Sequence, residues 1–303
     1  MNYLRKIYYK FKIDVIWHRF ASLITRLMWR PLHIMSAEET LAYILEHNCS
    51  VARFGDGELH IVAYGCALKF QRADARLQAR LKQVLKSSNP DLLLCLPNRL
   101  NITKKVERQR LSAFWQKSLK QHLYAWTRHL QKDRLYGDTN MSRLTETVFR
   151  GEKGPIDQFK EIWAKRNVII VEGEKTRFGV GNDLLNGTAS VKRILGPAKS
   201  AFDRYEALLE AVRKTAHQQD NPLVLIALGP TATVLASDLA DEGIQAIDIG
   251  HLDISYERMR TGCTGAIAGK YTNESDGGDL VGDCTDGTYL SQITASIPDC
   301  LDK

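Results

Sequence analysis

Two carboxylates separated by a single glycine stand directly after a short apolar stretch of the chain. Asp56 and Glu58 follow residues 50–54, which we expect to form a strand, and Gly55 and Gly57 allow a sharp turn there. Alternate residues of an extended backbone project to the same side, so the two acids could converge on one hard cation. The alternative is structural: Asp56 would cap the following helix and Glu58 would complement the helix dipole.

A second group of chemically active side chains lies in segment 172–183, directly after a continuous apolar stretch. Lys175 and Arg177 could hold phosphate oxygens, arginine as a bidentate fork and lysine as a point charge. The segment also contains further acids and an amide, namely Glu172, Glu174, Asn182 and Asp183. A turn with a purely structural role rarely carries so many charges, although these charges could instead pair with one another.

Two later segments complete the set of candidates. Segment 229–233 has a proline in its second position, which is typical of the first turn of a helix. The free backbone N–H groups of this helix start, together with the Thr231 hydroxyl, would form an anion site suited to a diphosphate. An ordinary turn between a strand and a helix is the alternative. In segment 248–257, Asp253 or His251 could act as a general base if it faces a cleft, while His251 could equally be structural.

The elements that would position these residues alternate between strands and helices from residue 36 onward. Strands are expected at 50–54, 91–96, 168–171, 191–195, 223–228 and 246–249, and helices at 36–47, 74–86, 103–131, 142–150, 155–166, 202–217 and 231–241. This alternation predicts an α/β fold, with a mostly parallel sheet and helices on both faces. Ligands of such sheets bind beyond the carboxyl ends of the strands, where all four candidate segments stand. We expect segment 262–288 to be a mobile loop before a short helix at 289–296.

Residues 1–35 form a basic, amphipathic segment that we expect to be helical and separate from the domain 36–303. Seven basic side chains stand against one acid in this segment, which therefore carries +6 of the chain's net charge of +7. Apolar stripes flanked by cations, with Trp17 and Trp29, suit an anionic membrane surface. The alternative is packing on the main domain or on a second copy in an oligomer. Because the rest of the chain is nearly neutral, its charge does not favour nucleic acid as a partner.

The composition narrows the class of protein further. The chain has 303 residues, of which 44% are apolar and 25% charged, as in globular enzymes. It contains no uncharged apolar run of about 18 residues, which argues against a conventional membrane-spanning helix. The six cysteines lack the paired spacing of zinc or thioredoxin-like motifs, so we expect reduced thiols in a cytoplasmic protein. The basic segment 1–35 would make this protein peripheral on the inner face of the cell membrane.

Taken in order, the four segments resemble the GT-D-type glycosyltransferases, a bacterial family. The matching stretches are 53–58, 171–177, 179–183, 228–233 and 246–253, and the resemblance spans about residues 36–297. It implies a Rossmann-like domain that transfers a sugar from a nucleotide sugar, typically a UDP-hexose. It also implies a divalent cation, Mn²⁺ or else Mg²⁺, at an Asp-X-Glu motif that falls on Asp56 and Glu58.

Sugar transfer requires stabilisation of the negative charge that grows on the departing diphosphate, by cationic side chains, a metal and a helix amino terminus. We therefore assign Asp56 and Glu58 to the metal, and Lys175, Arg177 and Thr231 to the diphosphate. Arg53, Asn182 and Asp183 are assigned to positioning the donor or the metal. If the reaction inverts the anomeric centre, Glu174 and Asp253 are the candidates for the general base. The expected acceptor is a saccharide, free or lipid-linked, in bacterial surface glycan or glycoprotein assembly. The alternatives are a metal-dependent phosphotransferase or nucleotide-sugar hydrolase on the same fold, and a non-catalytic nucleotide-binding membrane adaptor.

Overall fold

The computed structural model describes residues 16–17, 19–25, 27–28, 30–101, 109, 111–144, 154–272, 277–278 and 280–299. Within these residues one nine-stranded sheet has the order β1-β4-β3-β2-β8-β7-β5-β6-β9. Its strands are β1 (His33–Ile34), β2 (Ser50–Arg53), β3 (Leu92–Leu96), β4 (Leu135–Asp138), β5 (Asn167–Gly173), β6 (Ser190–Gly196), β7 (Pro222–Ala227), β8 (Ala246–Asp248) and β9 (Ile293–Ser296). All neighbouring strands run parallel, so their carboxyl ends lie at one edge of the sheet.

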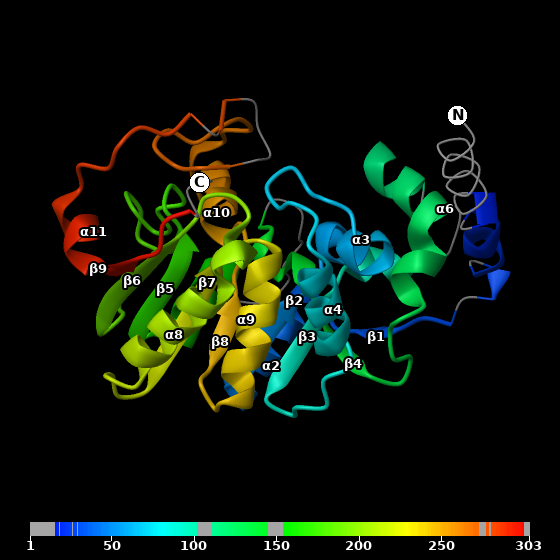
Figure 1. Ribbon diagram of the computed structural model, residues 1–303, viewed down its shortest axis with the longest axis horizontal. Helices are drawn as coiled ribbons and strands as arrows, with labels where there is room; N and C mark the ends of the chain where they lie inside the picture. Colours follow the sequence, from blue (N-terminus) through cyan, green and yellow to red (C-terminus); the bar gives the residue numbers. More distant parts are fainter. Residues whose placement is uncertain are drawn as a thin grey trace.

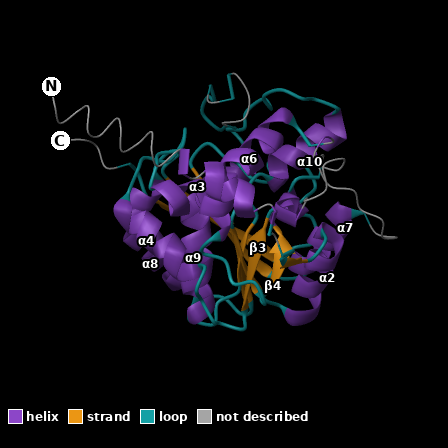
Figure 2. Ribbon diagram, turned by 90° about the vertical axis from the view of Figure 1, so that its right-hand side faces the viewer, coloured by secondary structure: helices purple, strands orange, loops and turns teal. Residues whose placement is uncertain are grey.

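Helices cover both faces of this sheet (Figures 1 and 2). On one face lie α4 (Ala75–Val84), α8 (Tyr205–Ala216) and α9 (Pro230–Asp241), and on the other lie α2 (Ala37–His47) and α7 (Pro155–Trp163). The shorter helices α3 (Asp56–Tyr64) and α10 (Leu252–Thr261) follow β2 and β8, and α6 (Ala113–Thr127) and α11 (Gly287–Gln292) lie toward the two ends of the sheet. The expected Rossmann-like α/β fold is confirmed.

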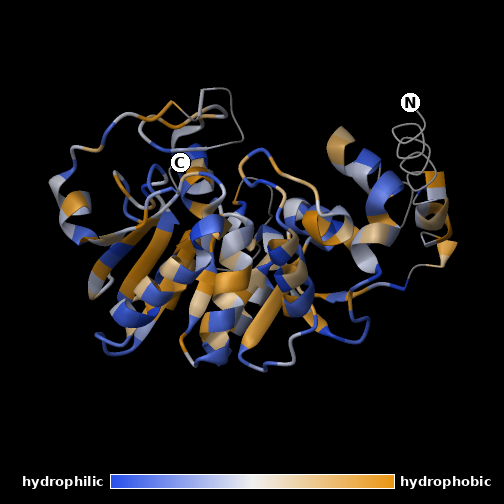
Figure 3. Ribbon diagram, viewed as in Figure 1, coloured by the Kyte–Doolittle hydropathy of each residue, from blue (hydrophilic) through white to orange (hydrophobic). Residues whose placement is uncertain are grey.

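The apolar runs form strands because they are buried on both sides. All five residues of β3 are buried, and the central strands are the most apolar part of the ribbon in Figure 3. In β5, Ile169 and Val171 pack in the core under α4, α8 and α9, whereas Val168 and Ile170 pack in the core under α2 and α7. This alternation follows from the two-residue period of a strand, which sends successive side chains to opposite faces.

Elements β1, α3, β4, α10 and β9 differ from the sequence-based expectation. Strand β4 was not predicted, because it lies in a segment that we interpreted as a connection. Segment 248–257 was not among the predicted helices, but α10 begins at Leu252 and includes most of it. The predicted terminal helix ends at Gln292, and β9 then pairs with β6, since its Ile and Thr residues suit a half-buried strand. The predicted helix 142–150 lies largely outside the described residues, as does the beginning of the predicted helix 103–131.

The amino-terminal segment is in contact with the main domain where it is described. Ser22 Oγ donates to the Gln121 carbonyl at 3.2 Å and accepts from the Tyr124 N–H at 3.2 Å, which ties residues 16–28 to α6. His33 and Ile34 form β1 and pair with β4, so these two residues belong to the sheet. Among the described residues, no helix has the length and apolarity required to span a bilayer.

Candidate functional site

A cavity of about 860 Å³ opens at the carboxyl edge of the sheet. Residues that follow each of the strands β2 to β8 line it, as the strand-end rule predicts. The amino-terminal residues of four described α-helices also reach it: Gly55 and Asp56 of α3, Ser112 before α6, Gly229 before α9, and His251 before α10. Because a helix amino terminus carries partial positive charge, this edge of the sheet favours an anionic ligand.

Asp56 and Glu58 both line the cavity, but not in the geometry that we predicted. They lie in the first turn of α3, where residues two positions apart do not face one another. The argument that an extended backbone makes them converge is therefore wrong. The structural alternative is realised in a different form: Gly55 is the N-cap residue, and Glu58 Oε2 accepts a hydrogen bond from the Gly55 N–H at 2.9 Å.

A third carboxylate, Asp248 at the end of β8, stands at the same wall of the cavity. Burial raises the pKa of Glu58 to about 7, and the negative charges of Asp248 and Asp56 contribute to that rise. Burial also raises the pKa of Asp248, although Arg53 opposes the shift. Asp56, Glu58 and Asp248 therefore lie near one another at this wall of the cavity, and Arg53 offsets part of their negative charge.

Arg53 uses its guanidinium to tie neighbouring parts of the sheet together. Its Nε and Nη2 donate to Asp248 Oδ1 at 3.2 and 3.0 Å, and its Nη1 donates to the Thr139 carbonyl at 3.1 Å and to Ser142 Oγ at 2.6 Å. We expected Arg53 to position the donor or the metal. It lines the cavity, and its contacts place Asp248 rather than a ligand directly.

A glycine is required beside this arginine. Gly250 has φ +48°, and a Cβ atom built there would lie 1.7 Å from Arg53 Nη2. Any other residue would strain the backbone and displace the guanidinium from Asp248.

The donor set fits a hard divalent cation only in part. Within the described ranges, no group of three or more His, Cys, Asp and Glu side chains is placed to hold a metal ion. Carboxylate oxygens are nevertheless ligands that Mg²⁺ and Mn²⁺ prefer, and Mg²⁺ is often held by one or two carboxylates plus water and substrate phosphates. A metal site at Asp56 and Glu58 would therefore need water and substrate oxygens to complete it.

The two cations of segment 172–183 do not line the cavity. The segment instead bonds to other parts of the chain. Arg177 is 8% exposed; its Nη1 donates to the Gly269 carbonyl at 2.9 Å, and its Nη2 donates to the Gly282 carbonyl. The Lys175 carbonyl accepts from the Tyr271 N–H at 2.9 Å. Neither Lys175 nor Arg177 is among the cavity-lining residues, so the structure does not place them for the diphosphate role that we assigned.

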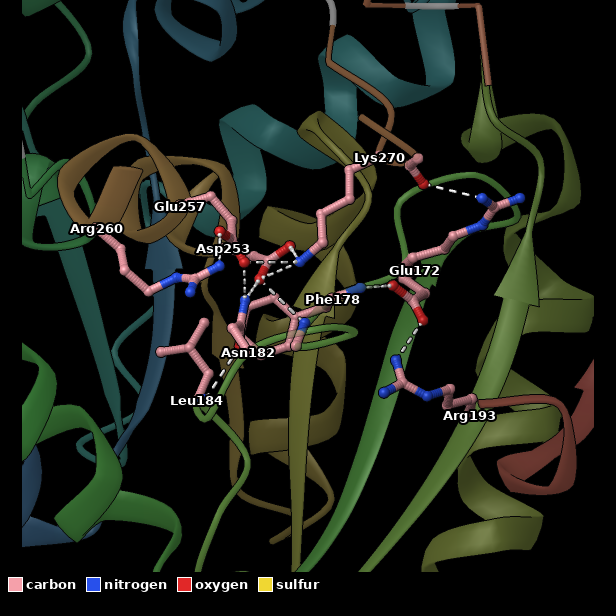
Figure 4. Close-up of polar contacts among 12 residues, drawn as sticks. Glu172, Phe178, Asn182, Leu184, Arg193, Asp253, Glu257, Arg260 and Lys270 are labelled. Carbon is pink, nitrogen blue, oxygen red and sulfur yellow. Dashed lines mark hydrogen bonds and ion pairs between the residues drawn. The ribbon is translucent and has the colours of Figure 1, made fainter. Parts of the chain in front are cut away.

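Asp253 lies within a buried ionic cluster beside the cavity (Figure 4). Its carboxylate accepts from Lys270 Nζ at 2.7 and 2.9 Å, from Asn182 Nδ2 at 2.7 Å and from the Gly179 N–H at 3.1 Å. Lys270 Nζ also lies 3.6 Å from Glu257 Oε1. A carboxylate with this many donors is arranged to hold the chain together, which argues against Asp253 as the general base.

The other assigned residues lie away from the cavity. Glu174 is exposed outside its wall, which argues against it as the base. Asp183 accepts from Lys160 Nζ and from the Tyr256 hydroxyl, both at 2.5 Å, and the lysine contact lowers its pKa to about 2. Thr231 is fully buried in α9, and its hydroxyl lacks a hydrogen-bond partner among the described residues.

The cavity thus brings together Arg53, Asp56, Glu58 and Asp253 of the predicted set, but not Glu174, Lys175, Arg177, Asn182, Asp183 or Thr231. Its wall contains cations and aromatic rings that the sequence analysis missed, namely Lys69, Phe70, Arg99, Trp115 and Arg143. The Arg99 guanidinium lies 5.2 Å from the centroid of the Trp115 ring. Arg99 follows β3, so the strand-end rule could have found it, whereas Arg143 follows the unpredicted β4.

Comparison with known proteins gives consistent matches over most of the chain. Residues 51–275 match the model of the family "Glycosyltransferase GT-D fold". The probable glycosyl transferase Gly of Streptococcus gordonii is 37% identical over 88% of this chain, and glycosyltransferase GlyD of Streptococcus pneumoniae serotype 4 is 36% identical over 91% of it. The chain spans only 39% and 34% of the lengths of these two relatives. A solved structure of a glycosyltransferase from Streptococcus sanguinis superposes with a TM-score of 0.75 at 33% identity, covering 88% of this chain and 99% of that one.

Proposed function

The chain belongs to the GT-D-fold glycosyltransferases, and from this premise we propose that it transfers a hexose from a nucleotide sugar, a UDP-hexose, to a saccharide acceptor in surface glycan or glycoprotein assembly. The observation that carries the proposal is the cavity at the carboxyl edge of the sheet, which combines acids, cations and helix amino termini in one space. Its volume of about 860 Å³ lies within the range of small-molecule sites.

The leaving group of this reaction is a nucleoside diphosphate, on which negative charge grows as its bond to the anomeric carbon of the sugar breaks. The amino termini of α3, α9 and α10 reach the cavity and favour that charge. Lys69, Arg99 and Arg143 line the same cavity, and they take the diphosphate-binding role that we first assigned to Lys175 and Arg177. The proposed stabilisation of the diphosphate charge by cations is therefore unchanged, but different residues provide it.

We further propose that Asp56 and Glu58 hold a divalent cation, Mn²⁺ or Mg²⁺, directly or through water. When bound, the ion would neutralise charge on the diphosphate oxygens. Two observations support this assignment: both acids line the cavity, and Asp248 adds a third negative charge beside them. Arg53 holds Asp248 in place, and Gly250 leaves room for Arg53.

A screen of nucleotide sugars with Mn²⁺ tests the proposal, by measuring nucleotide release with and without saccharide acceptors. Asp56→Ala should reduce acceptor-dependent release by at least about 100-fold, since even residues that only orient a metal ligand contribute about 10–100-fold. A chelator should have the same effect on the wild type. Asp157→Ala is the matched control, because Asp157 is an exposed acid in the first turn of α7, outside the cavity.

The outcomes separate the alternatives. Release of free sugar without an acceptor would support a hydrolase, and tight nucleotide binding without turnover would support a non-catalytic binding protein. Full activity of Asp56→Ala in added Mn²⁺ would refute the metal assignment. The transferase proposal would still be decided by acceptor-dependent nucleotide release from the wild type.

A further inference from the structure

An apolar surface extends along the described residues between 16 and 28, which lie beside α6. The large apolar side chains on it are between 40% and 79% exposed: Ile16, Trp17, Phe20, Leu23, Ile24, Leu27 and Met28. This segment and α6 lie side by side at one end of the molecule, and the ribbon of both contains apolar residues (Figures 1 and 3). We call this set of residues the amino-terminal face. Exposed apolar patches of this kind are typical of interaction sites.

The charge around the amino-terminal face is mostly positive. The exposed cations of this segment and of the α6 region are Arg19, Arg30, Lys117, Lys120, Arg128 and Lys132, and the exposed acid Asp133 follows the last of them. Residues 16–30 and 111–132 contain no Asp or Glu, and residues 1–35 as a whole carry a net charge of +6. A surface that combines exposed aromatic and aliphatic groups with an excess of cations is complementary to the headgroup region of an anionic bilayer.

We propose that the amino-terminal face binds an anionic lipid bilayer. A second copy of this chain is the less suitable occupant, because a symmetric dimer through the same face would bring two strongly positive segments together. A bilayer instead accepts the apolar side chains below its headgroups and the lysines and arginines beside its phosphates.

The position of this face has a consequence for the substrate. Phe114 is 54% exposed and also lines the cavity, and Leu111 and Trp115 line the cavity beside it. Because α6 contacts the amino-terminal segment and its first residues line the cavity, a protein bound through the amino-terminal face would hold the cavity close to the membrane. The acceptor that fits this arrangement is a saccharide carried on a lipid, an assignment that rests on the proposed function.

Flotation of the full chain with vesicles tests the surface directly, without donor or metal. Vesicles of phosphatidylglycerol mixed with phosphatidylcholine should bind the protein, and binding should weaken with added salt. Trp17→Ser/Phe20→Ser and Lys117→Glu/Lys120→Glu should each reduce the bound fraction by at least about tenfold. Matched controls remove similar groups elsewhere: Met259→Ser/Leu290→Ser, which are 46% and 48% exposed, and Lys165→Glu/Lys214→Glu.

Three results would overturn the inference. They are no flotation of the wild type, equal loss in the control variants, and a dimer in sedimentation that Trp17→Ser/Phe20→Ser dissociates while vesicles stay unbound. The last result would identify a second copy as the occupant. Transfer to a soluble saccharide should be unchanged in Trp17→Ser/Phe20→Ser, so failure of the catalytic proposal and failure of the membrane proposal give different readouts.

Discussion

Replacement of Lys270 by methionine tests whether the ionic cluster beside the cavity is structural. Lys270 and Asp253 are 5% and 3% exposed, and Lys270 Nζ contacts both oxygens of that aspartate. Methionine keeps much of the aliphatic stem and removes the charge, so the variant leaves a buried carboxylate without its cation. Burial already raises the pKa of Asp253, and Lys270 is the strongest group opposing that rise.

The expected cost follows from the contacts that remain. Breaking a buried pair by removing one partner costs about 3–5 kcal/mol. Asp253 would still accept from Asn182 and from the Gly179 N–H, so we expect a value near the lower end, about 3 kcal/mol. Asp253→Asn/Lys270→Met removes both charges and should regain part of this loss. The cost of the single variant should also shrink as pH falls, because protonation then neutralises the isolated carboxylate.

Urea denaturation at neutral pH measures these free energies of unfolding. Arg260→Met is the matched control: Arg260 contacts Glu257 at 2.8 Å in the same cluster, but its side chain is 49% exposed, so its removal should cost no more than about 1 kcal/mol. If Lys270→Met is no more destabilised than Arg260→Met, the ionic cluster is not the support that we infer. If Asp253→Asn folds stably and abolishes transfer, the catalytic role that we argue against is restored.

Two further predictions concern the acidic wall of the cavity. Gly250→Ala should lower transfer and cost about 1–3 kcal/mol of stability, since it adds strain at φ +48° and displaces Arg53. Gly243→Ala, which is also at positive φ but has open space around its Cβ, should keep activity; equal loss in both variants would contradict the clash. In the presence of a chelator, Glu58 should make the wild type less stable as pH rises from about 4.5 toward 7, because its raised pKa favours the protonated folded state. The loss in free energy of unfolding should approach at most about 3 kcal/mol, and Glu58→Gln should abolish this pH dependence. If the free energies of unfolding of the wild type and Glu58→Gln differ by the same amount at every pH, the predicted effect of Glu58 is absent.

Local sequence patterns were sufficient for the core of the sheet and for several helix boundaries. The predicted run 91–96 contains β3, and Ser36 begins α2 with the reciprocal capping bonds to Glu39 that its spacing predicts, at 3.1 and 2.7 Å. These features depend on neighbours in the chain, so the sequence displays them directly. Strand β4 escaped prediction because its short sequence contains Gly137 and Asp138, and only pairing with β3 and β1 makes it a strand.

The location of the site was also readable from the sequence, because in a parallel sheet every strand delivers its carboxyl end to the same edge. The sequence did not show which of the side chains at that edge face the cavity. Arg177 has the residue type of a phosphate-binding group but does not line the cavity, and Asp253 lines it but is bonded to Lys270. The partners of these two residues, Gly269, Gly282 and Lys270, lie about 15 to 105 residues further along the chain. The sequence therefore determined the fold class, the edge that carries the cavity and the acids of α3, since these follow from local pattern and strand direction. Tertiary structure alone decided which charges face a ligand and which hold the protein together, because burial and pairing depend on residues distant in the chain.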